Sequence, residues 1–326
     1  MKADTSIWLK HPLALAAIAV FCTLLWGTAF PCIKIGYELF LMDGGDVPSK
    51  FVFAGWRFFG AGVLVMVIGL LRHPKKMVLH RQDMAPVALL GFFQTFLQYL
   101  LLYSGIIYVS GTKSSIFTSL SAFGSVVLSA LFFRSDRLTL RKLGGCLIGI
   151  TGIVLMNWDG DGFGGFLWWG DGLVILSNLS GAVGNVISKK IAAGRDALQI
   201  AAWQLLIGGG SLTILGYLCG GTLHFYNIGC VLMLLYLAVM AGAAFLLWTV
   251  LLFHHPVSRV VVYLLLIPVF GTLCSGIFLG ENIFTWNNLL SLLLVCGGIF
   301  LVNGMPLSAA KEPPDIRQGG NRPHEP

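Results

Sequence analysis

Ten apolar runs, separated by short polar or charged connections, divide this 326-residue chain. A run of about 20 apolar residues forms a helix long enough to cross the ~30 Å hydrocarbon core of a bilayer. Open sheets and irregular segments leave backbone polar groups unsatisfied in lipid, whereas helices do not. The runs therefore predict an all-α, polytopic membrane protein with ten transmembrane helices, at residues 12–30, 51–71, 85–109, 114–133, 143–157, 170–188, 197–219, 228–253, 257–279 and 286–305.

The composition agrees with a membrane protein. Hydrophobic residues make up 56% of the chain and charged residues only 11%, against about 25% charged residues in a soluble domain. The seven cysteines lie in or beside apolar runs without the close spacing of metal ligands, so we expect neither a metal site nor disulfides. No cofactor is expected.

The basic residues are distributed unevenly between the two sides of the predicted helices. With the N-terminus inside, the opposite side holds only Lys50 and Lys113. An excess of Lys and Arg marks the cytoplasmic side of a membrane protein, so both termini are expected to be cytoplasmic. This distribution explains the net charge of +7 without nucleic-acid binding. The basic residues on the inner side are Lys2, Lys10, Arg72, Lys75, Lys76, Arg81, Arg134, Arg137, Arg141, Lys142, Lys189, Lys190, Arg195, Arg259, Lys311, Arg317 and Arg322.

The two halves of the chain resemble each other. Phe123-Gly124-Ser125 aligns with Phe270-Gly271-Thr272, and Trp56-Arg57 aligns with Trp203-Gln204 at the same shift of 147 residues. Because each copy holds five helices, an odd number, the second copy must enter the membrane from the opposite side. Inverted repeats of this kind are common in transporters, where the binding site lies near the midplane between the repeats.

These segments, in their order and spacing, resemble the EamA family of the drug/metabolite transporter superfamily. The matching stretches are Leu25-Trp26-Gly27-Thr28-Ala29-Phe30 with Lys34, Trp56-Arg57-Phe58, Gly170-Asp171, and Pro268-Val269-Phe270 followed by Gly280-Glu281. In the first copy, Asp136 stands where the family often has glutamate. The resemblance implies a first EamA-like repeat over residues 1–157 and a second over 170–305. The five prolines and mixed charges of residues 306–326 predict a disordered cytoplasmic tail.

The function implied by the resemblance is secondary transport. It would export amino acids or similar small metabolites across the plasma (inner) membrane by alternating access. A sugar-phosphate or nucleotide-sugar carrier of the same superfamily is one alternative, and a membrane scaffold or receptor subunit without transport is another. The expected partners are a small-molecule substrate and the lipid bilayer, with a homodimer left open.

Polar side chains inside the predicted spans are the candidate substrate-binding groups. Charged and amide groups in hydrocarbon must find partners or line a wet cavity. Ser114, Thr118, Ser121, Ser125 and Ser129 form one stripe of the fourth helix, which we assign to helix packing. The candidates include charged and amide side chains and one adjacent tyrosine, and Gln204 is included because it aligns with Arg57. They are Lys34, Arg57, Gln94, Gln98, Tyr99, Asn178, Asn185 and Gln204.

Two features of these candidates carry specific expectations. Lys34 and Arg57 are expected near the outer ends of their helices, where snorkelling to the interface is the alternative to function. Gln94 and Gln98 are expected to face Asn178 and Asn185 across the interface of the two halves. Three tryptophans within spans are candidates for an apolar wall of the substrate site, namely Trp26, Trp203 and Trp248.

No grouping of nucleophile, base and orienting residue occurs, so we expect no catalytic residues and no enzyme activity. All carboxylates lie in tails, loops or helix ends. Because proton-coupled carriers commonly hold a titratable group inside the membrane, facilitated diffusion without obligatory proton exchange is expected. The competing possibility is proton coupling through Glu281 or Asp171 from a helix end.

Overall fold

The computed structural model describes residues 9, 11–109, 111–156, 165–279 and 286–303, and these residues contain helices but no strand. The predicted all-α fold class is confirmed. The α-helices and the intervening π- and 3₁₀-helices are α2 (Pro12–Leu39), α3 (Val47–Arg72), α4 (Pro74–Met77), α5 (Arg81–Gly91), the π-helix η1 (Phe92–Leu97), α6 (Gln98–Gly105), the 3₁₀-helix η2 (Ile106–Tyr108), α7 (Gly111–Phe132), α8 (Leu140–Met156), the π-helix η3 (Trp168–Gly172), α9 (Leu173–Lys190), α10 (Ala197–Leu218), α11 (Ile228–His254), α12 (Val257–Val261), the 3₁₀-helix η4 (Val262–Leu265), α13 (Leu266–Leu279) and α14 (Trp286–Asn303).

Seven helical segments of the described chain are long and apolar enough to cross a membrane. Helices α7, α8 and α9 also form where spans were expected but are not among the seven. Helix α8 has 17 residues, and α9 carries buried Ser and Asn side chains that lower its hydropathy. Ten membrane crossings in two repeats therefore remain a prediction. The seven segments are Pro12–Leu39, Val47–Arg72, Arg81–Tyr108, Ala197–Leu218, Ile228–His254, Val257–Cys274 and Trp286–Asn303.

The first helix is longer than its apolar run. We expected it to end at residue 30, but α2 continues through Pro31 to Leu39. Lys34 and Glu38 are four residues apart, so they share one face of the helix, and both are exposed. Because both charges lie on one exposed face, the opposite face of α2 can pack against its neighbours. The helix can therefore extend beyond the uncharged run.

The predicted third span is interrupted in the middle by η1. A π-helical turn holds one extra residue and shifts the register of the side chains that follow, and such turns occur frequently at functional sites. Gln94 and Thr95 of this turn are both buried. The irregular turn thus directs polar side chains into the protein at the level of the expected membrane core.

The predicted ninth span is also interrupted, by η4, which ends three residues before Pro268. A proline cannot donate a backbone hydrogen bond to the residue four positions earlier, which here is Leu264. The released carbonyl lies within η4, where 3₁₀ geometry replaces the α-helical pattern. The proline therefore changes the helix one turn upstream of its own position.

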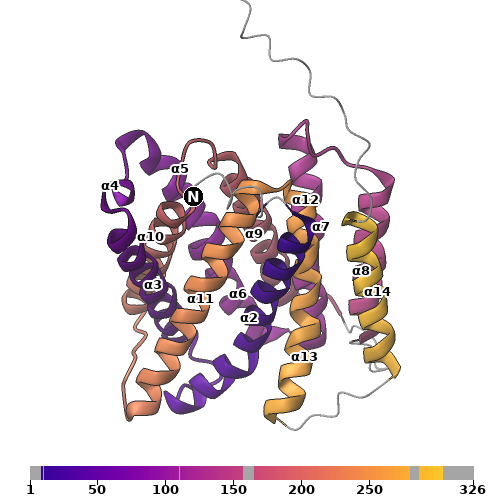
Figure 1. Cartoon of the computed structure of the whole chain (residues 1–326). Helices are drawn as coiled ribbons and strands as arrows, with labels where there is room; N and C mark the ends of the chain where they lie inside the picture. The colour runs from indigo at the N-terminus through magenta and orange to yellow at the C-terminus, as the bar shows by residue number, and fades with distance from the viewer. Residues whose placement is uncertain (1–8, 10, 110, 157–164, 280–285, 304–326) are drawn as a thin grey trace, which may run out of the picture.

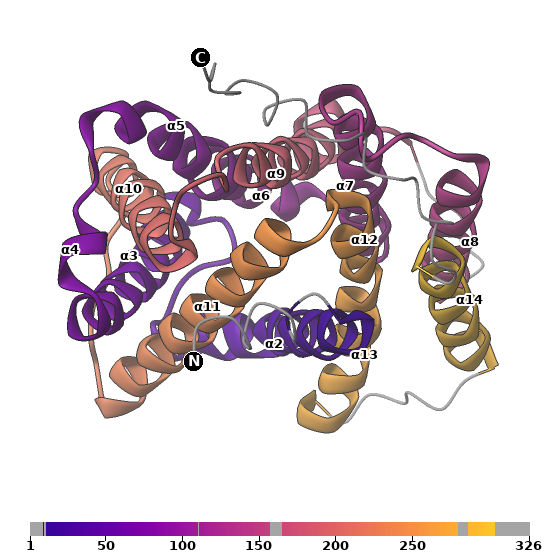
Figure 2. The same cartoon turned by 45° about the horizontal axis from the view of Figure 1, so that its top comes forward.

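The helices pack into one bundle of antiparallel and crossing pairs, shown from two directions in Figures 1 and 2. Helix α3 packs extensively along α10, and α8 packs along α14 at the opposite edge of the molecule. Helix α2 contacts both α11 and α13, while α7 packs on α9. Helix α11 crosses the middle of the bundle in Figure 2. It contacts α2, α3, α9 and α10.

The α3–α10 contact depends on small residues that let two backbones approach closely. A Cβ atom added at Gly62 of α3 would lie 2.7 Å from the backbone nitrogen of Leu206 on α10. Close packing through small residues is the usual way in which membrane helices associate. Glu281, residues 157–164 and the predicted tail at 306–326 lie outside the described residues.

Candidate functional site

A buried asparagine on α9 joins three other elements of the bundle. The Oδ1 atom of Asn185 accepts hydrogen bonds from Nε2 of Gln94 on η1 (3.1 Å) and from Nε1 of Trp248 on α11 (3.0 Å). Its Nδ2 atom donates to Oγ of Ser125 on α7 (3.1 Å). All four side chains are buried. We call Asn185, Gln94, Trp248 and Ser125 the asparagine cluster.

The asparagine cluster satisfies nearly the whole hydrogen-bonding capacity of its central amide. Asn185 uses both lone pairs of Oδ1 and one N–H of Nδ2. In membranes such interhelical hydrogen bonds contribute about 0.6–2 kcal/mol each. The cluster therefore fixes the relative positions of α7, α9, α11 and η1.

An unbroken series of ring contacts leads away from the asparagine cluster. Trp248 lies edge-on to Trp26 of α2, with ring centroids 5.1 Å apart, and Trp26 contacts Phe245 of α11 at 5.7 Å. Phe245 contacts Phe58 of α3 at 5.8 Å, and Phe58 contacts Tyr99 of α6 at 4.3 Å. Edge-to-face arrangements of this kind are favoured by the charge distribution of aromatic rings. The series connects helices α2, α3, α6 and α11.

Arg57 of α3 lies at the far end of this aromatic series. Its guanidinium carbon is 4.2 Å from the ring centroid of Phe58 and 5.6 Å from that of Tyr99. Only 3% of the residue is exposed, and its Nε atom has no hydrogen-bond partner among the described residues. Within that part of the chain the guanidinium also makes no ion pair. A charge at this depth costs at least about 2.5–3.5 kcal/mol on insertion scales.

The expectation that Arg57 lies near the outer end of its helix is wrong. Helix α3 begins at Val47, four residues before the predicted start, because Asp46 caps its first turn through the backbone N–H of Ser49. Arg57 is ten residues after Val47, which places it ~15 Å along the helix. Snorkelling to the nearer interface therefore does not explain this charge.

Gln98 and Asn178 do not join the asparagine cluster. Nδ2 of Asn178 donates to the backbone oxygen of Val174 in its own helix (2.8 Å). Gln98 lies against Gly181, where an added Cβ would come within 2.7 Å of its Oε1 atom. The two helices meet directly here, so of the expected facing amides only Gln94 and Asn185 bond to each other.

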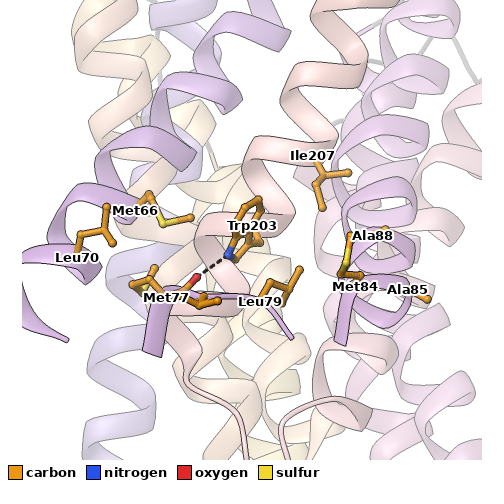
Figure 3. A pocket seen from close by; sticks show the side chains of 10 residues that line it. Met66, Leu70, Met77, Leu79, Met84, Ala85, Ala88, Trp203 and Ile207 are labelled. Carbon is orange, nitrogen blue, oxygen red and sulfur yellow. Dashed lines mark hydrogen bonds between the residues drawn. The ribbon is translucent and has the colours of Figure 1, made fainter. Parts of the chain in front are cut away.

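Trp203 and Gln204 lie away from the aromatic series. Nε1 of Trp203 donates to the backbone oxygen of Met77 (2.9 Å), and its ring lines an apolar pocket of about 790 Å³ (Figure 3). Gln204 is fully buried, and neither end of its amide has a hydrogen-bond partner among the described residues. The lining of the pocket comprises Met66, Leu70, Met77, Val78, Leu79, Met84, Ala85, Ala88, Trp203 and Ile207.

Lys34, the other intramembrane cation expected from the sequence, is exposed on α2. It makes no hydrogen bond, ion pair or ring contact with the described residues. We therefore leave Lys34 out of the candidate site. That site comprises the asparagine cluster, the aromatic series and Arg57.

Sequence reasoning missed three members of this site. Ser125 was assigned to helix packing, although it aligns with Thr272, so that both halves carry a hydroxyl at this position. Phe58 follows Arg57 directly, and Phe245 precedes Trp248 by three residues on one face of α11. Their neighbours were identified, but a single sequence does not show which face of each helix turns inward.

A second polar cluster lies at the end of the bundle that is expected to be cytoplasmic. Asp136, in the connection between α7 and α8, accepts hydrogen bonds from the backbone N–H (2.9 Å) and the hydroxyl (2.5 Å) of Ser258 in α12. The Nζ atom of Lys142 is 2.5 Å from the same carboxylate. We call these three residues the aspartate clamp, because they tie the α7–α8 connection to the start of the ninth predicted span.

The surroundings of Asp136 favour its charged form. Burial alone would raise the pKa of this carboxyl, but hydrogen bonds from Lys142 and Ser258 and the charge of Lys142 outweigh burial and lower its pKa below the ordinary value of 3.8. The carboxylate is therefore ionised at neutral pH. Among the described residues, no group of His, Cys, Asp and Glu is arranged to hold a metal ion.

Comparison with known proteins identifies relatives over nearly the whole chain. The model of the EamA-like transporter family matches residues 13–158 and again residues 168–304. An uncharacterized transporter of Archaeoglobus fulgidus is 27% identical over 85% of this chain and 94% of its own length. The uncharacterized transporter YoaV of Bacillus subtilis is 24% identical over 86% of this chain and 93% of its own.

A solved structure shares the architecture. One protein of known crystal structure superposes with a TM-score of 0.73 at 20% sequence identity, covering 89% of this chain and 96% of that one. At this identity the likeness shows the fold alone.

Proposed function

Because this chain belongs to the EamA-like transporter family, we propose that it is a secondary transporter that exports amino acids or similar small metabolites across the plasma membrane by alternating access. The observation that carries the proposal is the asparagine cluster with its aromatic series. It brings polar and aromatic side chains from both halves of the chain together at the level of the bundle core. A solute that binds here would exchange hydrogen bonds with these side chains, which now bond to one another, in place of those that it loses when it leaves water.

The packing of the helices supports an inverted repeat. The second and seventh predicted spans, α3 and α10, pack on each other, and so do the fifth and tenth, α8 and α14. The contact of the first span with the ninth (α2 with α13) has its counterpart in the contact of the sixth with the fourth (α9 with α7). A twofold relation between the halves predicts this set of pairs, and the family model also matches the chain twice.

The aspartate clamp supports a bundle that is closed at its cytoplasmic end. Helix α7 packs on α12 and η4, the clamped end of the ninth span, while the following α13 packs on α2. In an inverted repeat the two halves can exchange conformations, which would open this end and close the other. We propose that release of the clamp accompanies that exchange.

We further propose transport without obligatory proton exchange. Among the described residues, no carboxylate hydrogen-bonds to the asparagine cluster or pairs with Arg57. A proton-carrying group would be expected to contact the binding groups as access alternates. The net direction of flux would then follow the substrate gradient.

Solute flux into proteoliposomes tests the proposal. We expect counterflow of at least one labelled amino acid or related small metabolite without a pH gradient, and none in protein-free vesicles. Nucleotide sugars and sugar phosphates are included as the alternative substrates. Counterflow of those alone would replace the proposed substrate class, and uphill accumulation driven by an imposed pH gradient would contradict transport without protons. A chain that moves no solute of either class would be a scaffold or receptor subunit.

A further inference from the structure

The guanidinium of Arg57 is an unpaired charge in the described core of the protein. The residue is only 3% exposed, its guanidinium lies over the ring of Phe58 and near that of Tyr99, and it makes no ion pair or hydrogen bond with the described residues. Most buried cations in proteins pair with an anion because an uncompensated charge is unfavourable in a medium of low polarity. We propose that Arg57 binds the carboxylate of the transported substrate. This inference rests on the proposed function and assigns a chemical class to its substrate.

The geometry around Arg57 suits a planar anion. An arginine side chain presents a rigid fork of N–H donors that matches the two oxygens of a carboxylate, and stacking on an aromatic ring leaves the edge of the fork available. Phe58 and Tyr99 lie next to each other beside the guanidinium, with ring centroids 4.3 Å apart. The Nε atom is buried and has no hydrogen-bond partner among the described residues, so this donor remains to bind a ligand.

The single positive charge of Arg57 favours a ligand that carries a single negative charge. The other described cation with a ring contact is Lys50, whose Nζ lies over the ring of Tyr37 and donates to the backbone oxygen of Gly44. Lys50 is therefore already engaged, whereas Arg57 contacts the aromatic series without an ion pair among the described residues. One guanidinium balances a carboxylate, whereas a phosphate monoester carries up to two negative charges at neutral pH.

The aromatic series indicates what the rest of the substrate is like. From Arg57 the rings of Phe58, Phe245, Trp26 and Trp248 follow one another toward the asparagine cluster. Aromatic rings bind apolar or planar groups through their faces and edges. A substrate with a carboxylate at one end and an apolar or aromatic body would contact both parts of this surface.

Binding to purified protein in detergent tests the inference. We measure calorimetric titrations with four compounds that share a phenyl group: 3-phenylpropionate, its neutral amide, phenethylamine and phenyl phosphate. The two compounds that decide the matter are the acid and its amide. We expect 3-phenylpropionate to bind at least tenfold more tightly than its amide, as expected when a charge-assisted hydrogen bond is lost. Phenethylamine should not bind measurably, and phenyl phosphate should bind more weakly than the carboxylate.

Variants of the two membrane-level cations provide the matched comparison. We expect Arg57→Met to reduce the affinity for 3-phenylpropionate to that of its amide, and Arg57→Lys to retain part of it because the charge remains without the planar fork. Lys34→Met should leave the affinity unchanged, since Lys34 is exposed on another helix. Should Arg57→Met fail to fold, the comparison of acid with amide on the unaltered protein still decides the question.

Two results would overturn the inference. One is equal affinity of the unaltered protein for the acid and the amide, and the other is unchanged affinity of folded Arg57→Met for the acid. Tighter binding of phenyl phosphate than of the carboxylate would instead assign Arg57 to phosphate recognition and would also contradict it. These outcomes are separate from the failure of transport, because binding is measured without vesicles.

Discussion

Asn185 joins four structural elements through one amide, and this arrangement gives its side chain a role that a neighbouring asparagine lacks. Its hydrogen bonds reach η1, α7 and α11, whereas Asn178 bonds to a carbonyl of its own helix. The two residues lie seven positions apart on α9 and are equally buried. They therefore form a natural pair in which only the contacts between helices differ.

This pair gives a prediction for stability. Asn185→Leu removes three interhelical hydrogen bonds, each contributing about 0.6–2 kcal/mol in membrane proteins, and leaves buried polar atoms of its partners unsatisfied. We expect Asn185→Leu to lower the thermal unfolding temperature in detergent by several degrees and Asn178→Leu to lower it much less. Equal effects of the two substitutions would show that the asparagine cluster does not connect the helices energetically.

The aspartate clamp gives a prediction for pH dependence. The pKa of Asp136 is lowered in the folded protein, so its carboxylate stabilises the fold above the ordinary pKa of 3.8, and this contribution is lost as pH falls through the lowered value. We expect Asp136→Asn to be less stable than the unaltered protein at neutral pH by about 1–3 kcal/mol. The difference should shrink as pH falls below 3.8 toward the lowered pKa.

Thermal unfolding from about pH 7 down to about pH 3 measures this difference. Asp43→Asn serves as the control because Asp43 is an exposed loop carboxylate whose side chain makes no hydrogen bond or ion pair with the described residues. A stability gap between Asp136→Asn and the unaltered protein that stays constant to the lowest pH would argue against an ionised clamp.

At the scale of the helix, close approach of α3 and α10 depends on glycines whose surroundings differ. Gly62 lies against the backbone of Leu206, whereas an added Cβ at Gly60 would meet only the Cβ of Ala238, at an ordinary contact distance of 3.4 Å. Both residues are in the middle of α3, so replacing either by alanine raises the intrinsic helix propensity by a similar amount, about 1 kcal/mol.

We therefore expect opposite results at the two positions. Gly60→Ala should be neutral or stabilising, while Gly62→Ala should lower the unfolding temperature because its methyl group would force α3 away from α10. Unfolding of the two purified variants, monitored by circular dichroism, makes the comparison. If Gly62→Ala is at least as stable as Gly60→Ala, the close contact of these helices is not what holds the edge of the bundle together.

The positions of the helices were largely predictable from the sequence, but their interruptions were not. Apolar length located the spans, but it did not locate η4, the irregular segment that lies upstream of Pro268 in the ninth span. Nothing in the run around Gln94 announced a π-helix, since its residues are compatible with a regular helix. Arg57 and Asn185 were identified because buried polar groups are conspicuous in apolar runs, whereas the inward direction of Phe58 and Phe245 depends on tertiary packing.

At the scale of the whole molecule, the distribution of basic residues predicts the orientation in the membrane. Seventeen of the twenty-one Lys and Arg residues fall on the side of the N-terminus when ten crossings are assumed. We expect reporter fusions at Gly162 and after Pro326 to lie on opposite sides of the membrane. Fusions that report from the same side would contradict the ten-helix topology and the inverted repeat with it.

At this scale we propose that the protein transports by alternating access, with the aspartate clamp closing one end of the bundle. The most direct test is a reversible cross-link across that clamp. The hydroxyl of Ser258 lies 2.5 Å from the carboxylate of Asp136, so cysteines introduced at both positions, in a chain without its native cysteines, would be close enough to join.

Counterflow of the identified substrate in proteoliposomes is measured before cross-linking, after it, and after reduction. We expect the cross-linked Asp136→Cys, Ser258→Cys variant to lose counterflow and to regain it after reduction, and we expect neither single variant to respond to the oxidant. Counterflow that is as fast with the cross-link complete as after its reduction would show that this end need not open. That result would contradict alternating access through this end.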